Sequence, residues 1–583
     1  MKPNKLLLAL IFTTFSFVNY SQTIPPVNLE QGYTVHNGHI VYPLPNDGYS
    51  TVIEVGPGKT YTELYDVPKS NVAAGTLIKI FYRPEPYRIK VYIKVQATEA
   101  AHFRIQGIPD DNGNLPIITN ENSTHDWGGG DVNQWVNNLG IMVIYGPWGS
   151  KPSWIDLVNL HFKIYGTTTD DNCIGVWSKI DHLSVKGCVF DNCSNGVFTQ
   201  ANNNDMTSIS TYSLIEGCRF TNCGVQNSYL QHNIYAQGTH ALIQFNYIEQ
   251  QKESAIGSTL KDRATFTVIR YNYMEGTART IDLVEPEEAE IATNESDTWD
   301  DAYVYGNLIV NKRPNSGVMF HYGWDDMANP YEYQRKGTFF FANNTVIMDF
   351  DDDSWNKELF DINKASTKIN FVNNILLAKG MHYFYIFRTG ETTNEGGTIN
   401  FTTSWIKAFA SDNNNEWKLT SGENNDYHQT GQDNLLTGNE PGFTDADNGD
   451  YTLTQSSACR HSGTHIDSVA IEYNPISLNN ITQRNDVENP NMGCYSDNFI
   501  NGVAYNKKDN NINIYPNPAK NKLQLTFNNQ LLNSKNIIIY NVFGQIVKQL
   551  NTDKKQLSID ISDLQNGVYF LKTGNISKKF IVE

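Results

Sequence analysis

Long apolar runs and long helical repeats are both missing from this sequence. Beyond Val18 no apolar stretch approaches the roughly 18 residues that a membrane-spanning helix needs, so we expect no transmembrane segment in the mature chain. Stretches with helical periodicity are scarce, whereas short runs of Val, Ile, Thr, Tyr and Phe recur between Gly, Asn and Asp. That pattern is typical of all-β proteins.

Positive charge is also in short supply. The chain has 44 Lys and Arg residues against 62 Asp and Glu residues, which gives a formal net charge of −18 at pH 7. Because nucleic acids and acidic membranes bind chiefly through basic side chains, we expect neither as a partner. The same balance counts against a polyanionic substrate unless a cleft carries a local basic cluster.

Cysteine is too rare for a disulfide scaffold, with seven in 583 residues. Five fall between Cys173 and Cys223 without CxxC spacing, which favours buried, small apolar side chains over a metal site. Cys459 and Cys494 stand apart from these and could pair. The odd total leaves at least one thiol free.

The first residues have the composition of a secretory signal peptide. Lys2 and Lys5 precede a mostly apolar stretch over residues 6–18, and polar residues follow at 19–22. We therefore predict a removable signal peptide over residues 1–21 and an N-terminal extension over residues 22–50. We expect the mature chain to act as a soluble monomer.

A short strand pattern repeats along the middle of the chain. Residues 187–193 read Gly-Cys-Val-Phe-Asp-Asn-Cys, and residues 217–223 read Gly-Cys-Arg-Phe-Thr-Asn-Cys. The same slot recurs with spacings of 28, 30, 28, 26, 35, 37 and 30 residues, at Leu160, Cys188, Cys218, Asn246, Asn272, Asn307, Asn344 and Asn374. One strand-rich unit of this length per repeat predicts a β-solenoid, a parallel β-helix over residues 51–500. Asn in a fixed slot predicts a ladder of amide hydrogen bonds between coils.

Two segments resemble a known superfamily. Residues 56–62 with 77–80 resemble the first coil of secreted right-handed parallel β-helix proteins of the pectate-lyase-like superfamily, and residues 441–443 with 449–453 resemble their closing region. The resemblance implies an all-β, right-handed parallel β-helix. It leaves the activity open, because the superfamily includes lyases, hydrolases, epimerases and non-enzymes.

The end of the chain forms a separate unit. A polar linker over residues 501–511 precedes alternating strands with an Ile-Tyr-Pro-Asn-Pro start, which predict a small sandwich of about seven strands over residues 512–583. This region resembles the type A C-terminal sorting domain of the Bacteroidetes type IX secretion system. The resemblance implies passage through the periplasm and across the outer membrane, with that machinery as partner, to a secreted or cell-surface location. A carbohydrate-binding sandwich is the alternative.

Charged residues gather at one position of consecutive coils. Strand alternation that points Ile234, Leu260, Leu283 and Phe320 into the core turns their neighbours outward, and coil stacking then aligns Asn233, Tyr235, Lys261, Asp282 and His321. Arg263 shares the face of Lys261. Strict alternation would bury Asp262, so we expect it to pair with an Arg or to mark the end of its strand.

This column suggests β-elimination of a uronate. The reaction needs a base, a group that neutralises the carboxylate, and an acid for the leaving oxygen. Lys261 is the predicted base, with a pKa lowered by Arg263. Arg263 or Arg279 would hold the carboxylate, and His321, His232 or Tyr235 would be the acid. Several β-helix lyase families use Lys and Arg in this way.

Departures from those families leave other assignments open. The Glu-x-Glu calcium cluster of alginate-type lyases is absent, and only Glu249 and Glu253 lie nearby. Lys261 and Asp282 alone could form a surface ion pair, and His232 could be structural. A hydrolase could use Asp282 and Glu285 as its two carboxylates. The acidic stretch over residues 285–301 is expected to be a solvated loop, with calcium binding as a lesser alternative, and residues 445–450 a turn.

Tryptophans add a binding signal on loops. Trp127, Trp135, Trp148, Trp154 and Trp324 could stack on sugars, whereas Trp177 or Trp355 could belong to the core.

Together the sequence predicts an exported enzyme that acts on an extracellular polysaccharide, a lyase rather than a hydrolase. The alternative is a non-catalytic glycan-binding or adhesin β-helix. We assign catalysis to Lys261, Arg263, Asp282 and His321, and substrate binding to Tyr235, Arg279, His232 and Trp324. No residue is assigned to a metal, and calcium is the one cofactor left open.

Overall fold

The computed structural model describes residues 24–69, 72–127, 139–146, 150–168, 173–276, 279–311, 318–325, 333–349, 358–362, 367–379, 384–389, 398–407, 417–421, 428–497, 512–527, 535–541, 545–552, 554–573 and 576–583. The predicted signal peptide and linker lie outside these ranges. The chain divides into two compact units, residues 1–502 and 503–583, which we describe separately.

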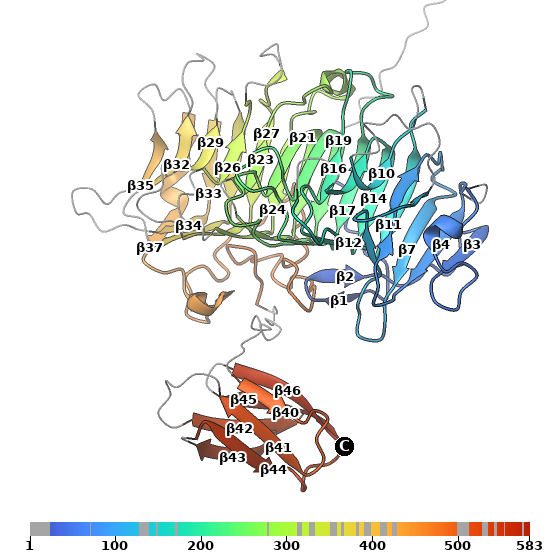
Figure 1. Cartoon of the computed structure of the whole chain (residues 1–583). Coiled ribbons are helices and arrows are strands. Elements are labelled where there is room, and N and C mark those ends of the chain that lie inside the picture. Colours follow the sequence, from blue (N-terminus) through green and yellow to red (C-terminus); the bar gives the residue numbers. More distant parts are fainter. Residues whose placement is uncertain are drawn as a thin grey trace, which may run out of the picture. The chain divides into compact units, whose positions relative to one another are not determined.

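The first unit is a parallel β-helix, as the repeat predicts (Figure 1). Each full coil contributes up to three strands, and each strand pairs in parallel with its counterpart in the next coil. The first strands of the coils are β6 (Lys90–Ile93), β9 (Asp126–Trp127), β10 (Gly140–Ile144), β13 (Ile174–Ser178), β16 (Val197–Thr199), the start of β19 (Ile234–Gln244), the start of β21 (Leu260–Arg270), β23 (Ile281–Leu283), β26 (Phe320–Tyr322), β29 (Glu358–Ile362), β32 (Phe384–Thr389) and β35 (Trp417–Ser421).

The second strands follow a bend in each coil. They are β3 (Thr51–Val55), β4 (Thr76–Phe81), β7 (Phe103–Ile108), β11 (Ser153–Val158), β14 (Asp181–Lys186), β17 (Thr211–Glu216), the ends of β19 and β21, β24 (Ala302–Tyr305), β27 (Thr338–Ala342), β30 (Lys368–Val372), β33 (Thr398–Thr402) and β36 (His428–Thr430). The third strands are β5 (Tyr87–Arg88), β8 (Ile117–Thr119), β12 (His161–Lys163), β15 (Val189–Asp191), β18 (Arg219–Thr221), β20 (Tyr247–Ile248), β22 (Tyr273–Glu275), β25 (Leu308–Asn311), β28 (Thr345–Asp349), β31 (Ile375–Lys379), β34 (Ser404–Lys407) and β37 (Leu435–Gly438).

The core is built from identical positions of stacked coils. Phe162, Phe190 and Phe220 come from consecutive third strands, and their ring centroids are 5.2 and 4.8 Å apart. All five clustered cysteines are buried free thiols in this core, which confirms the apolar interpretation. Cys459 and Cys494 are also buried free thiols, so the pairing that the sequence allowed is not formed. Their backbone amides are held separately, by Ser457 and Thr345.

The predicted asparagine ladder is confirmed. The Oδ1 atoms of Asn272, Asn307, Asn344 and Asn374 each accept hydrogen bonds from the backbone and side-chain amides of the preceding asparagine, at 2.8–3.2 Å. The side chains are completely buried. A buried amide without partners is costly, so this ladder fixes how the coils stack.

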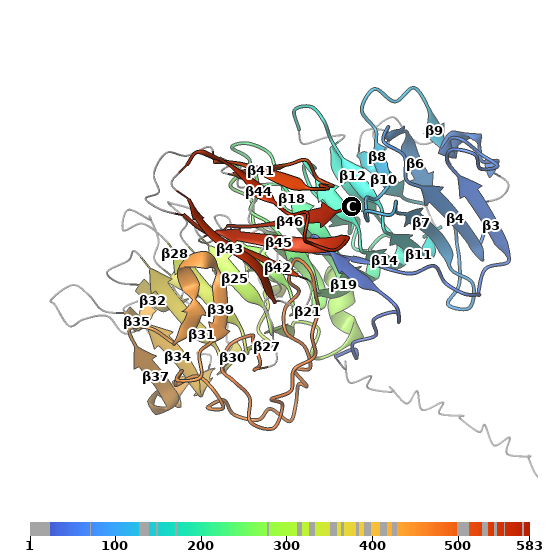
Figure 2. The ribbon, with the colours of Figure 1, turned by 90° about the horizontal axis from the view of Figure 1, so that it is seen from below.

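An N-terminal strap, residues 24–50, lies across the outside of the coils (Figures 1 and 2). It contains the antiparallel pair β1 (Thr34–His36) and β2 (His39–Val41). The backbone of Ile40 donates to Gly217 O at 2.8 Å, and Tyr42 Oη donates to Glu216 at 2.7 Å. Gly38 N–H donates to Leu478 O at 2.8 Å, so the strap also contacts the segment that follows the last strand of the β-helix.

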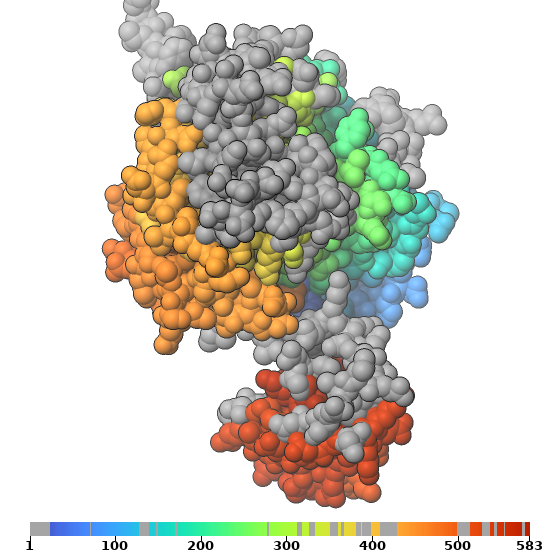
Figure 3. Space-filling view, turned by 90° about the vertical axis from the view of Figure 1, so that its left-hand side faces the viewer, coloured from blue at the N-terminus to red at the C-terminus, as the bar shows by residue number. Residues whose placement is uncertain are grey.

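That segment, the closing region (residues 439–497, orange in Figure 3), packs along the outside of the coils. Its Tyr451 and Met492 share a buried cluster with Ile375 of β31. It holds the antiparallel pair β38 (Phe443–Asp445) and β39 (Asp450–Leu453). Short 3-10 helices are η1 (Leu64–Asp66), η4 (Glu290–Glu295), η6 (Gln432–Asn434) and η7 (Ala446–Asn448). The η7 segment confirms the turn expected at 445–450. No helix within the described ranges is long and apolar enough to span a membrane.

The second unit consists of two antiparallel sheets, and its seven described strands agree with the prediction. One sheet holds β40 (Ile512–Tyr515), β41 (Lys522–Phe527) and β44 (Gln556–Asp560), and the other β42 (Lys535–Asn541), β43 (Ile546–Thr552), β45 (Gly567–Thr573) and β46 (Ile576–Val582). Its core is separate, with Leu523, Ile537, Leu571 and Phe580 fully buried.

Candidate functional site

Four polar side chains from successive coils form one column. Strand register aligns Tyr235 of β19 with Lys261 of β21, Lys261 with Asp282 of β23, and Asp282 with His321 of β26. The same register continues to Asp361 of β29. The stacking is the one that the repeat predicts, because parallel coils place equivalent residues about 4.8 Å apart.

Two cations and two aspartates form the centre of this column. Lys261 Nζ lies 3.0 Å from Asp282 Oδ2 and 2.6 Å from Asp325 Oδ2. Arg263 Nη2 lies 2.6 Å from the same Asp325 oxygen, and Nη1 lies 3.3 Å from Glu285 Oε1. Asp325 therefore bridges Lys261 and Arg263. Sequence reasoning missed it, because it lies three residues beyond the end of β26, where strand alternation no longer places side chains.

The column is much less exposed than the alternation argument predicts. Only 3% of the Asp282 side chain and 2% of the Arg263 side chain are exposed, against 13% for Lys261. His321 is 2% exposed, and Asn233 is fully buried. The expectation of solvent exposure is wrong for Asn233, Asp282 and His321, whereas Tyr235 and Lys261 are partly exposed. Asp282 and His321 are buried because they pack against charged partners on neighbouring coils.

The protonation of Lys261 also differs from the prediction. Burial favours the neutral amine and Arg263 repels the ammonium ion, but attraction to Asp282 and Asp325 outweighs both and raises the pKa of Lys261. The pKa of Asp325 falls to about 2, because the attraction of Arg263 and Lys261 outweighs the effect of burial. The pKa of Asp282 is held well below its usual range in the same way, by Lys261 and His321. Lys261 is therefore a protonated ammonium group at neutral pH.

His321 and Asp282 form a buried dyad. His321 Nδ1 lies 2.8 Å from Asp282 Oδ1, and Arg279 Nη1 lies 3.2 Å from the same nitrogen. Within the described residues, His321 Nε2 has no hydrogen-bond partner. The carboxylate fixes the tautomer that carries its proton on Nδ1, which leaves a lone pair on Nε2. Arg279, with 36% of its side chain exposed, lies at the outer edge of the site.

Other buried carboxylates lie next to the column and form ion pairs or hydrogen bonds with it or with neighbouring segments. Asp262 and Arg335 form a completely buried pair at 2.6 Å, which confirms that Asp262 pairs with an arginine. Glu285 Oε2 accepts the backbone N–H of Asp325 at 2.9 Å and is itself fully buried. The acidic stretch is therefore not a solvated loop throughout: Asp300 and Asp301 are buried too and accept the backbone N–H groups of Lys336 and Thr338.

The remaining predicted residues surround the column. Tyr235 is half-buried and stacks on Phe198 at 4.8 Å. His232 is buried, and its Nδ1 accepts the N–H of Ser258 at 3.0 Å. Burial, with repulsion from Lys261, lowers the pKa of His232 to about 3, so its imidazole is neutral. Trp324 is half-buried directly after β26.

The structure agrees with some of the tryptophan predictions and contradicts one of them. Trp127 is fully buried and donates to Val67 O at 3.0 Å, so the assignment of this residue to sugar stacking is wrong. Trp177 is buried, as its alternative interpretation required. Trp154 is half-buried and stacks on His182. Trp135, Trp148 and Trp355 lie outside the described residues.

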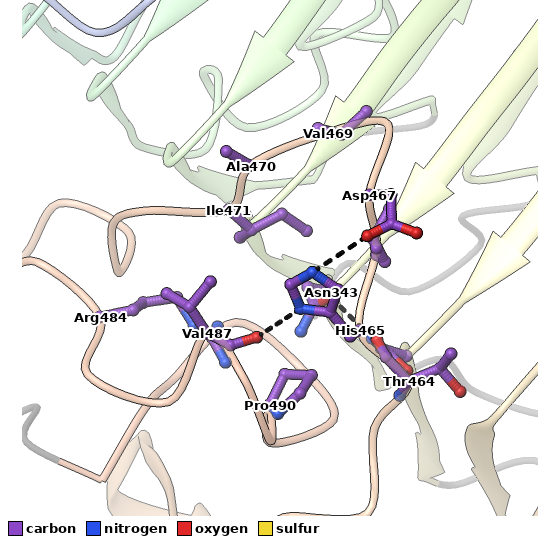
Figure 4. Close-up of a pocket in the computed structure, with 12 residues that line it drawn as sticks. Asn343, Thr464, His465, Asp467, Val469, Ala470, Ile471, Arg484, Val487 and Pro490 are labelled. Carbon is purple, nitrogen blue, oxygen red and sulfur yellow. Dashed lines mark hydrogen bonds and ion pairs between the residues drawn. The ribbon is translucent and has the colours of Figure 1, made fainter.

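A hollow of about 200 Å³ lies elsewhere, between the coils and the closing region (Figure 4). Asn343 and Asn373 line it, and both donate to backbone oxygens of the closing region. His465 contacts Val487 O at 3.0 Å and Asp467 at 3.3 Å. These bonds attach the closing region to the coils, and we assign this hollow no chemistry.

Comparison with known proteins identifies the second unit. Residues 513–583 match the family of secretion system C-terminal sorting domains. The chain is therefore exported across the outer membrane to the cell surface or the medium. A segment of 70 residues is 37% identical to β-agarase A of Zobellia galactanivorans, but it spans only 12% of this chain and 13% of that enzyme.

Two solved structures are similar to the chain in part. Both are the pectin methylesterase from Aspergillus niger, one deglycosylated and one with a single N-acetylglucosamine stub. They are 11% and 10% identical, cover 72% and 71% of this chain and 93% and 92% of their own, and have TM-scores of 0.20 and 0.19. The β-helix is established by the parallel register of its own strands.

Proposed function

We propose that this chain is an exported enzyme that cleaves uronate-containing polysaccharides by β-elimination at the Lys261–Asp282–His321 column. The observation that carries the proposal is the buried His321–Asp282 dyad, whose Nε2 points a lone pair away from its orienting carboxylate. A histidine held in one tautomer by a carboxylate is a common arrangement for proton transfer.

The protonation states assign roles that differ from those the sequence suggested. His321 Nε2 removes the proton beside the uronate carboxylate, and Arg279 neutralises that carboxylate. Lys261, which is protonated, gives its proton to the leaving oxygen. The carbon–oxygen bond breaks as the carbon–carbon double bond forms. Because Nε2 of His321 is buried, this proposal requires residues around His321 to move apart when the polymer binds.

Export supports a polymeric substrate. A protein sent to the cell surface meets polysaccharides too large to enter the cell, and a rigid solenoid offers them an extended face. The hydrolase alternative with Asp282 and Glu285 has less support, because Glu285 is fully buried and engaged by Arg263 and Asp325.

A non-catalytic glycan-binding protein is the second candidate. It is favoured by one observation: Lys261 and Arg263 are both already paired with carboxylates. Such a saturated network could be purely structural, with the polysaccharide binding to its outer edge.

The test is incubation of the secreted protein with alginate, polygalacturonate, chondroitin sulfate and agarose. Ultraviolet absorbance would detect unsaturated uronates, and a reducing-sugar assay would detect every cleavage. We expect unsaturated products from at least one acidic polymer, and none from His321→Gln. New reducing ends without unsaturation would overturn elimination in favour of hydrolysis. Binding of a polymer to the protein without any cleavage product would support the non-catalytic glycan-binding alternative.

A further inference from the structure

A second hollow, of about 300 Å³, lies on a different face of the β-helix. It runs along the second strands, including the parts of β19 and β21 that follow the bend, whereas the charged column occupies the parts before the bend. Pro25 of the N-terminal strap also lines it. Its size and its largely apolar lining with a few polar groups are typical of ligand sites.

One wall is a stack of six rings from six consecutive coils. The rings belong, in order, to His102, Trp154, His182, Tyr212, His240 and Phe266. Their centroids are 3.8–5.6 Å apart, and the four from Trp154 to His240 are nearly parallel, with interplanar angles of 10–21°. Stacking occupies the ring faces, so the wall presents ring edges; Trp154 carries an indole N–H and Tyr212 a hydroxyl that can hydrogen-bond.

Five of the six rings sit on strained backbone. Trp154, His182, Tyr212, His240 and Phe266 have φ between 53° and 60°. Such angles are costly for residues other than glycine. The same unfavourable conformation in five successive coils places these five rings in line along the hollow; Tyr212 remains 46% exposed, whereas Phe266 is buried.

The floor is apolar at one end and hydroxylic at the other. Register aligns Ser184 with Leu214, Leu214 with Leu242, and Leu242 with Val268, one per coil. These side chains point outward from the sheet, since their strand neighbours Val185, Ile215 and Ile243 belong to the core. The ring wall therefore repeats at each coil, while the floor changes from polar at Asp156 and Ser184 to apolar at Leu214 and Leu242.

The charges of the residues that line the hollow indicate which class of ligand it can bind. None of the described residues that line the hollow is Lys or Arg. Its one carboxylate, Asp156, lies 2.9 Å from His102 Nδ1 and is paired with it. A ligand bearing carboxylates or sulfates would find no lysine or arginine here, and the one histidine with a raised pKa, His102, is already paired with Asp156. A chain of neutral hydroxylated rings could rest on the floor and hydrogen-bond to the wall.

We propose that this hollow binds a neutral saccharide chain that lies along the solenoid axis. One face of carbon–hydrogen groups would cover the partly exposed Leu214 and Leu242, and hydroxyl groups would meet the edges of Trp154 and Tyr212. The site is independent of the proposed cleavage, because it lies on another face and excludes acidic sugars. Binding in this hollow would attach the protein to a neutral polysaccharide, while the Lys261–Asp282–His321 column acts on an acidic one.

The experiment is calorimetric titration of the secreted protein with cellohexaose, mannohexaose and neoagarohexaose, with an alginate hexasaccharide and decanol as contrasting probes. We expect at least one neutral hexasaccharide to bind, and Leu242→Arg to weaken it at least tenfold by filling the hollow with a charged side chain. Val52→Arg, at an exposed position on β3, is the matched control and should leave the affinity unchanged.

Several results would overturn the proposal. These are no binding of any neutral hexasaccharide, binding that Leu242→Arg leaves intact, or binding of the alginate probe or decanol alone. If Leu242→Arg does not fold, Leu242→Gln and Tyr212→Phe replace it, each with an expected loss of at least threefold. Because binding is measured directly, the result does not depend on whether the protein cleaves anything.

Discussion

Nδ1 of His321 lies 2.8 Å from Oδ1 of Asp282, and both side chains are almost completely buried. The two residues come from adjacent coils, 39 positions apart in the chain. A histidine in this position can accept a proton only through Nε2, and that restriction makes the proposed role of the dyad testable.

His321→Gln should lower the rate of product formation on the cleaved polymer by 10²–10⁴-fold, about the range that a general base contributes. Gln keeps a polar group near Asp282, so the melting temperature should change little. Initial rates from ultraviolet absorbance check the prediction. Loss of activity accompanied by a large fall in melting temperature would instead indicate a structural histidine.

Lys261→Met should destabilise the β-helix by about 3–5 kcal/mol, because it leaves the carboxylates of Asp282 and Asp325 buried with one cation fewer. The free energy of unfolding from denaturant titration measures the effect. Lys379→Met is the control: Lys379 lies 3.5 Å from Asp447, whose side chain is 95% exposed. That change should cost less than about 1 kcal/mol. Equal losses of unfolding free energy in Lys261→Met and Lys379→Met would contradict the distinction between the buried and the exposed ion pair.

Asn307→Ala should destabilise the chain by about 2–4 kcal/mol. Asn307 Oδ1 accepts two hydrogen bonds from Asn272, and its Nδ2 donates to Ile269 O and Asn344 Oδ1. Removing the amide leaves several of these groups buried and unpaired. Asn400→Ala serves for comparison, since the half-buried Asn400 donates to Asn370 at 3.2 Å near solvent and should cost below about 1 kcal/mol. Comparison of the thermal unfolding of Asn307→Ala and Asn400→Ala checks this prediction.

His39 predicts a pH dependence of stability. Burial, with repulsion from His36, lowers the pKa of His39 to about 3. Between its unfolded pKa, about 6.5, and this value, the unfolded chain binds a proton that the folded chain excludes, so stability falls as pH falls, by about 1.4 kcal/mol per pH unit. The buried His232 contributes in the same way, so His39→Phe should reduce the slope between pH 6.5 and 3 by the share of one histidine, whereas His125→Gln, at an exposed histidine, should not change it. An unchanged profile in His39→Phe would refute this account.

The stacking of coils could be predicted from sequence because it depends on identity at a fixed slot. Asn246, Asn272 and Asn307 recur at spacings compatible with one coil, and the same register places Lys261 beside Asp282. Alternation placed Asp262 inside the protein and left two outcomes, an arginine partner or the end of the strand; the structure has the first, with Arg335, which lies 73 residues away and could not be named.

Other parts of the site could not be predicted, because they depend on segments outside the strands. Asp325 reverses the expected pKa shift of Lys261, yet it lies beyond β26, where periodicity carries no information. Burial of Asp282 and His321 follows from neighbours on other coils rather than from their own strands. The ring stack was missed for a different reason: positive φ in Trp154, His182 and Tyr212 breaks the alternation on which the reading relied.

The N-terminal strap has a consequence for how such proteins can vary in length. Tyr42 binds Asn159 of one coil, and Ile40 binds Gly217, two slots later. The strap is therefore attached at two fixed positions, and the number of coils between them must match the distance that the strap spans. A duplication or deletion of one coil between them would leave one contact unmatched. Relatives of this chain should therefore keep a constant coil number there and gain or lose coils elsewhere.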